Sequence, residues 1–193
     1  MDFNKAEIFV RNLLQTKLSP YLYYHSYEHT IDVTRQAEIL AKEEKVSEKE
    51  VMLVKTAALF HDCGFINLYQ NHEEESARIA REQLPLCGYT NEDIDVICQL
   101  ILKTKFPAQP KTHLEKILCD ADLDYLGRDD YEEISQKLLQ EWTSRGKDYS
   151  TGEWHELQIN FIQKHAYWTA SAQAKRNVQK ADNLMRLRSV VGL

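Results

Sequence analysis

Apolar residues recur along this chain at intervals of three and four positions, the spacing that places them on one face of an α-helix. The first example is Ala6, Val10 and Leu13, and Pro20 ends that pattern. The same spacing predicts helices over residues 3–18, 26–40, 48–61, 72–86, 94–101, 111–127, 131–142 and 167–188, with another helix beginning at Trp154. We find no strand-like alternation of useful length, no internal repeat and no linker-like segment. The pattern therefore predicts an all-α, single-domain bundle over residues 1–193.

Three apolar stripes each contain a polar residue that can bind a metal ion. His29 lies on the inward face of the second predicted helix, His61 at the end of the third, and Asp122 on the inward face of the sixth. Asp62 directly follows His61, where Gly64 interrupts the helix. Because buried polar groups need partners in the same core, the stripes predict that these side chains meet. Two imidazoles and two carboxylates suit Mn²⁺, Mg²⁺, Fe²⁺ or Zn²⁺, with positions left for water and substrate.

The helical phase also ranks the neighbouring charged residues. Two residues along a helix make a turn of about 200°, so Asp120 and Asp124 point away from the stripe of Asp122, and we expect them to be solvated or to support the ligands from behind. Extending the apolar face of the predicted helix over residues 94–101 places Lys105 near the protein interior, where it could offset the charge of a phosphate. Lys103 is a second candidate for this role. Alternatively, Lys105 lies at the surface, where its methylene groups cover apolar side chains and its amine stays in water.

Composition and charge narrow the function. The 193 residues are 43% hydrophobic, which is enough for a core without disulfide or metal support, so a metal ion here would serve chemistry first. The 30 acidic and 24 basic residues give a net charge of -6, which argues against a surface for duplex nucleic acid. No apolar run approaches the roughly 20 residues of a membrane span, and the first residues lack a signal peptide. The 4 cysteines form no CxxC pair, so we expect reduced thiols in a cytoplasmic protein.

The order His29, His61-Asp62, Asp122 resembles the HD-domain superfamily of metal-dependent phosphohydrolases. Asp122 is the second acid of an Asp-Ala-Asp string, similar to the final aspartate of that family. The resemblance implies a helical HD-domain bundle with a core of about residues 23–127 and C-terminal helices packed on it. It also implies hydrolysis of a phosphoester, phosphodiester or pyrophosphate bond in a small nucleotide by a metal-activated water, which Asp62 could orient.

A narrower similarity covers residues 24–33, which look like the first histidine motif of the cyclic-nucleotide phosphodiesterases in this superfamily. This similarity implies that His29 binds the metal and that His25 is the general acid that protonates the leaving oxygen. An imidazole near one helical turn from His29 suits that role, although a surface histidine before a helix is the alternative. Ser26 replaces the asparagine of the motif, and we identify no counterpart of the glutamine that clamps the nucleotide, so cyclic specificity is left open.

Other parts of the chain leave alternatives open. His72-Glu73 resembles a His-Glu string of smaller bacterial HD hydrolases, which implies groups beside the metal or the substrate, whereas an acidic first helical turn is the other interpretation. A rival function, an HD-type di-iron oxygenase, needs further histidine ligands, for which His72 is the candidate. A nucleotide-sensing HD module without turnover is a third hypothesis. Five basic residues are interpreted as a solvated face, with a homodimer or nucleic-acid contact as the alternative: Lys175, Arg176, Lys180, Arg186 and Arg188.

Overall fold

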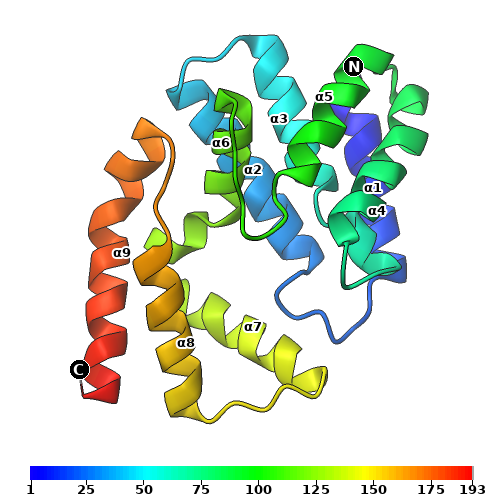
Figure 1. The fold of residues 1–193 in the computed structure, drawn as a ribbon. Coiled ribbons are helices and arrows are strands. Elements are labelled where there is room, and N and C mark those ends of the chain that lie inside the picture. Colours follow the sequence, from blue (N-terminus) through cyan, green and yellow to red (C-terminus); the bar gives the residue numbers. More distant parts are fainter. Residues whose placement is uncertain (193) are drawn as a thin grey trace.

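The structure is a computed structural model that describes residues 1–192 (Figure 1). Its elements in chain order are α1 (Phe3–Lys17), α2 (Tyr27–Glu43), α3 (Glu48–Phe60), η1 (Cys63–Ile66), α4 (His72–Gln83), η2 (Leu84–Cys87), α5 (Asn91–Leu102), α6 (His113–Asp122), η3 (Asp124–Gly127), α7 (Tyr131–Ser144), α8 (Thr151–Lys164) and α9 (Ala170–Val191), where η marks a 3₁₀ helix. No β-strand occurs within residues 1–192, which confirms the all-α class.

Most of the α-helices begin after a serine or threonine whose hydroxyl accepts a hydrogen bond from the third helical N–H group. These capping residues are Ser26, Ser47, Thr90, Thr112, Ser150 and Thr169. Each such cap stabilises a helix by about 1 kcal/mol because it satisfies a backbone donor that has no partner inside the helix. Ser26 therefore determines where α2 begins, and with it the direction in which His29 points.

The buried apolar side chains form two clusters. The larger cluster joins α1 through α6, together with Tyr167, which precedes α9, and Ala172 of α9, around residues such as Phe60 and Ile101. The smaller cluster joins Tyr24, which precedes α2, to η3, α7, α8 and α9, and its least exposed members are Leu126 and Ile162. Within this second part α8 and α9 lie side by side (Figure 1). Because Tyr24 belongs to the smaller cluster while α2 belongs to the larger one, the start of α2 lies where the two clusters meet.

The segment predicted as one helix over residues 111–127 is two elements. Helix α6 ends at Asp122, and Leu123, with φ -105° and ψ 17°, leads into η3. The helical count from Asp122 therefore does not reach Asp124. We expect Asp120 and Asp124 either to be solvated or to support the ligands from behind, and the first alternative is wrong, because their relative exposures are 0% and 1%.

The C-terminal helix explains the burial of these two aspartates. Asp120 accepts hydrogen bonds from the backbone of Trp168 and from the backbone and hydroxyl of Thr169, at 2.7 to 3.1 Å. Asp124 accepts two from the guanidinium of Arg176, at 2.7 and 2.8 Å. Both carboxylates thus anchor the start of α9 to α6 and η3.

Two glycines allow distant segments to approach closely. A Cβ atom on Gly64 would collide with the backbone of His72 and Ser76, and the Gly64 N–H donates to the Ser76 hydroxyl at 2.8 Å. A Cβ atom on Gly127 would collide with Arg176 of α9. Gly64 therefore lets α4 begin directly against the His61-Asp62 doublet, whereas Gly127 lets α9 pack against η3.

Candidate metal centre and adjoining cavity

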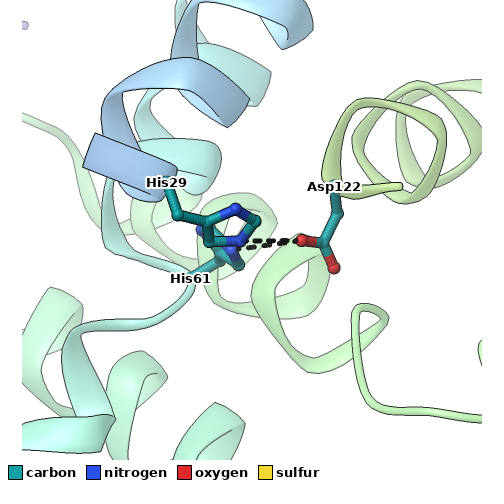
Figure 2. Close-up of side chains that lie close together, drawn as sticks. All are labelled: His29, His61 and Asp122. Atoms are coloured by element: carbon teal, nitrogen blue, oxygen red, sulfur yellow. Dashed lines mark ion pairs between the residues drawn. The ribbon is translucent and has the colours of Figure 1, made fainter. Parts of the chain in front are cut away.

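Three helices bring His29, His61 and Asp122 together. His29 lies in the first turn of α2, His61 is the C-cap residue of α3, and Asp122 is the last residue of α6. One ligand atom from each lies within 4.8 Å of the other two, and Figure 2 shows the Asp122 carboxylate facing both imidazoles. Oδ1 of Asp122 lies 3.3 Å from Nε2 of His29 and 3.4 Å from Nε2 of His61.

Asp62 approaches the same two imidazoles. Its Oδ2 lies 3.5 Å from Nε2 of His29 and 3.2 Å from Nε2 of His61. Atoms that bind one ion with bonds of about 2.1 Å are separated by roughly 3 to 3.5 Å, so these distances suit ligands of a common cation. The structure thus brings together all four residues that the helical phase and the His61-Asp62 doublet indicated.

The donor atoms of this group fit a metal ion. Nδ1 of His61 lies 2.6 Å from the carbonyl oxygen of Ala58, so Nδ1 holds the proton and Nε2 has a free lone pair. Nε2 of His29, Nε2 of His61 and Oδ2 of Asp62 are all buried and have no hydrogen-bond partner within residues 1–192. Buried polar atoms are rarely left unsatisfied, and a divalent cation would satisfy all three at once.

The electrostatics of the centre favour positive charge. Burial acts to raise the pKa of Asp62, but nearby imidazoles, chiefly that of His61, hold it well below its ordinary range. His29 and His61 overcome burial in the same way and hold the pKa of Asp122 low. Burial acts to lower the pKa of His61, whereas the two aspartates raise it well above its ordinary value. The carboxylates therefore stay ionised and stabilise a cation, which is either an imidazole proton or a metal ion that replaces it.

A cavity of about 540 Å³ adjoins the centre, and both Asp62 and Asp122 line it. Helices α7 and α8 contribute part of its wall through Leu138, Trp142, Gln158 and other residues. Most of the wall is aromatic or aliphatic and consists of Tyr24, Phe65, Tyr69, Phe106, Ala108, Leu123, Tyr125, Leu138, Trp142, Leu157 and Phe161. Such a wall suits a flat, partly apolar ligand whose charged end reaches the metal ligands.

His25 also lines this cavity and is held there by Glu141 of α7. Nδ1 of His25 lies 2.6 Å from Oε1 of Glu141, so Nδ1 donates to the carboxylate and Nε2 is left for the cavity. Glu141 is 0% exposed and also accepts hydrogen bonds at 3.0 Å from the backbone of Tyr24, the backbone of His25 and the hydroxyl of Tyr69. Burial acts to lower the pKa of His25, but the hydrogen bond to Glu141 and nearby carboxylates raise it above its ordinary value.

Glu141 is a residue of the site that sequence reasoning missed. It follows Ile134 and Leu138 at helical spacing, so it lies on the apolar face of α7. A carboxylate in an apolar stripe is the same signal that indicated Asp122. Applied to α7, that signal identifies Glu141.

His72 and Glu73 form the start of α4, and both line the cavity. The His72 ring stacks on Phe65 with a centroid distance of 3.8 Å, and the His25 ring stacks on the same phenylalanine at 4.2 Å. Nε2 of His72 lies 3.5 Å from Oδ1 of Asp62. His72 therefore lies beside the candidate ligand Asp62, and Glu73 lies next to His72, with its Oε1 3.6 Å from Nε2 of His72.

Lys105 is not among the residues that line the cavity. Its amine donates to Asn71 at 2.9 Å and to Glu74 at 2.6 Å, and its side chain is 45% exposed. Helix α5 ends at Leu102, so the stripe from which the inward position of Lys105 was extrapolated stops before this residue. The structure thus places Lys105 on the surface beside α4.

Comparisons with known proteins agree with this geometry. Residues 26–124 match the HD domain family and contain all four candidate ligands. An uncharacterized protein of Clostridium beijerinckii is 37% identical over 82 residues, which are 40% of this chain and 51% of that protein, so the match spans about half of the relative. Within residues 1–192, no helix is both long and apolar enough to cross a lipid bilayer.

Two solved structures share the helical arrangement. A predicted HD superfamily hydrolase from an uncultured Thermotogales bacterium is 19% identical, with a TM-score of 0.66 over 98% of this chain and 91% of that chain. Bacillus subtilis YpgQ in complex with ADP is 20% identical, with a TM-score of 0.69 over 98% of this chain and 95% of that chain. Because the family match covers just over half of the residues and includes the whole candidate metal centre, the chain belongs to the HD domain family.

Proposed function

We propose that this protein is a metal-dependent phosphohydrolase that acts on a small nucleotide. The observation that supports it best is the group of unpartnered, buried ligand atoms on His29, His61 and Asp62, next to a cavity that also contains His25. The fold it shares with YpgQ, which was solved with ADP, supports a nucleotide as the ligand. The aromatic wall of the cavity is consistent with a base as the flat part of that ligand.

His29, His61, Asp62 and Asp122 would hold the divalent ion. Such an ion supplies positive charge to a phosphoryl oxygen and makes a water molecule acidic enough to attack phosphorus near neutral pH. Asp62 lies between the centre and the cavity, since it contacts both imidazoles and lines the wall. Its carboxylate is therefore well placed to orient the attacking water.

His25 would protonate the leaving oxygen. The Glu141 carboxylate accepts a hydrogen bond from Nδ1–H of His25, which directs Nε2 to the cavity, and it favours the protonated ring. A proton donor contributes about 100-fold or more when the leaving group is a poor one. Lys147 of the loop between α7 and α8 also lines the cavity, so in this structure it is better placed than Lys105 to contact a phosphate.

The test is an activity screen of the purified chain with Mn²⁺ against nucleoside mono-, di- and triphosphates, cyclic nucleotides and dinucleotides. Products would be identified by chromatography and phosphate release. We expect hydrolysis of at least one class, lost together with bound metal in His61→Ala. In His25→Ala we expect the metal to be retained and the rate to fall, most for substrates with poor leaving groups, whereas His113→Ala, a surface histidine, serves as the matched control.

Two outcomes would contradict the proposal. Nucleotide binding without any product would favour a sensing module. An unchanged rate for an unactivated substrate in His25→Ala would remove His25 from the mechanism while leaving the metal centre intact.

A further inference from the structure

Tyr69 belongs to the loop between η1 and α4 and reaches across the cavity wall to helix α7. Its hydroxyl donates to Oε1 of Glu141 at 3.0 Å, and the same oxygen lies 2.6 Å from Nδ1 of His25. A carboxylate oxygen has two lone pairs, so Oε1 accepts both hydrogen bonds at once. Burial and the charge of Glu141 raise the pKa of Tyr69, so its hydroxyl keeps the proton that it donates. The tyrosine thus supports Glu141 at the oxygen that faces His25.

The ring of Tyr69 is held by Arg145, the C-cap residue of α7. The guanidinium carbon lies 3.5 Å from the centre of the ring, which is a cation–π contact. Phe65 packs against the same ring at a centroid distance of 5.3 Å. The end of α7 therefore contacts Tyr69 twice, through Glu141 at the hydroxyl and through Arg145 at the ring.

Arg145 does not form the ion pair that its position favours. Glu141 and Arg145 are four residues apart, the spacing at which an acidic and a basic side chain attract each other along a helix. Within residues 1–192 Arg145 nevertheless forms no ion pair, and its guanidinium lies on Tyr69, while Glu141 pairs with His25. A guanidinium bound to Glu141 would neutralise the carboxylate and compete with His25 for its oxygens.

We propose that Tyr69 is a positioning residue for His25. Its hydroxyl keeps Oε1 of Glu141 directed at the imidazole, and its ring keeps the guanidinium of Arg145 away from that carboxylate. Glu141 thereby remains a charged partner of His25, whose Nε2 stays directed at the cavity. This inference rests on the role of His25 in the proposed function, but the arrangement of the four side chains is measurable without a substrate.

Two substitutions of Tyr69 and one double variant test this role by steady-state kinetics. Tyr69→Phe removes the hydroxyl and keeps the ring, so kcat should fall severalfold. Tyr69→Leu also removes the surface on which Arg145 stacks, so the guanidinium can pair with Glu141, and kcat should fall by about 10-fold or more. Combining Tyr69→Leu with Arg145→Gln removes the competing cation and should restore the kcat of Tyr69→Phe. KM should change little, and Tyr21→Phe, at an exposed tyrosine, is the matched control.

A second measurement needs no turnover. Proton NMR detects the Nδ1 proton of His25, because a short hydrogen bond to a carboxylate moves an imidazole proton far downfield and slows its exchange with water. The loss of this signal in His25→Ala assigns it. We expect the signal to broaden and move upfield in Tyr69→Leu, to recover in the double variant and to stay unchanged in Tyr21→Phe.

The proposal is overturned if the double variant recovers neither kcat nor the Nδ1 signal. Because Tyr69 lines the cavity, a higher KM with unchanged kcat in Tyr69→Phe would mean that it contacts the substrate, which also overturns the proposal. Circular dichroism would check folding, and Tyr69→Phe against Tyr21→Phe gives the answer if Tyr69→Leu fails to fold. The expected order of NMR signals without hydrolysis of any nucleotide would support the positioning role and count against the phosphohydrolase. Hydrolysis with a signal that neither Tyr69 variant alters would do the reverse.

Discussion

The segment of residues 26–124 and the segment of residues 131–191 contribute different things to one cavity. The first contains all four candidate metal ligands and is the part that matches the HD domain family. The second lies outside that match, yet it supplies Glu141, which holds His25, and cavity residues such as Trp142, Gln158 and Phe161. We propose a division in which the family segment holds the metal ion and the C-terminal helices, which supply part of the cavity wall, determine which substrate reaches it.

The largest effect is expected from two aspartates of α6 that lie two residues apart. Asp122→Ala removes a candidate metal ligand, so bound Mn²⁺ should be lost and the hydrolytic rate should fall by more than about 100-fold. Loss of a residue that only hydrogen-bonds to a metal ligand already lowers metal affinity or activity by about 10- to 100-fold. Asp120→Ala removes the anchor of α9 and leaves three donors without an acceptor. It should lower the free energy of unfolding by about 1 to 3 kcal/mol and retain the metal.

Metal analysis and urea unfolding of both variants check this contrast. If Asp120→Ala lost metal while remaining folded, the C-terminal helices would help to form the metal centre, and the division between the two segments would be wrong.

The four candidate metal ligands could be predicted from the sequence because their positions depend on local geometry. Helical phase within α2 and α6 identifies His29 and Asp122, and adjacency to His61 adds Asp62. The predictions were wrong where packing between elements that are distant in the sequence determines whether a residue is buried. Periodicity tells which face of a helix is inward and is silent on what covers the opposite face, so the burial of Asp120 by α9 was not predictable.

The same reasoning explains two other differences. Glu141 lies in an apolar stripe and was identifiable in principle, but its partner His25 is 116 residues away in the chain, and only the fold brings the two together. Lys105 was placed inward by extending a helical pattern beyond Leu102, where the helix in fact ends. Extrapolation past a helix end is therefore unreliable even when the pattern before it is clear.

A smaller effect on the rate is expected when the hydrogen bond between His25 and Glu141, which links the two segments, is altered. Glu141→Gln replaces a carboxylate that accepts four hydrogen bonds by an amide that cannot match them all, so His25 is held less well. We expect the rate to fall about 10-fold or more, as part of the contribution of a general acid, with metal content unchanged. Glu132→Gln makes the same exchange at an exposed position of α7 and serves as the control.

The pH profile provides a more specific check of that link. Glu141 raises the pKa of His25, and a general acid acts only when protonated, so the rate falls as pH rises through this pKa. Without the carboxylate the pKa is lower, so the fall should begin at a lower pH in Glu141→Gln. A loss of rate with an unmoved alkaline limb would mean that Glu141 acts only through packing.

The two close-contact glycines provide a matched comparison between the segments. Gly64→Ala and Gly127→Ala each insert a methyl group against a neighbouring backbone, and each should lower the free energy of unfolding by about 1 to 3 kcal/mol. Only Gly64→Ala displaces His72 and Glu73 from Asp62, so only this variant should also bind metal more weakly. Urea titrations and Mn²⁺ binding isotherms, both corrected for the folded fraction, would separate the effects. Equal weakening of metal binding in both variants would contradict the assignment of Gly64 to the site.

The smallest effect is expected from two lysines, one in each segment. Lys105 forms a surface pair with Glu74, and exposed pairs of this kind contribute little, so Lys105→Met should change kcat/KM by less than about 2-fold. Lys147 lines the cavity, and its amine lies 4.4 Å from the centre of the Trp142 ring. If the C-terminal segment contacts the substrate, Lys147→Met should raise KM severalfold and leave kcat nearly unchanged, because a contact made equally in the ground and transition states affects binding alone. The reverse ranking of the two lysines in steady-state kinetics would return substrate recognition to the family segment and end the proposed division.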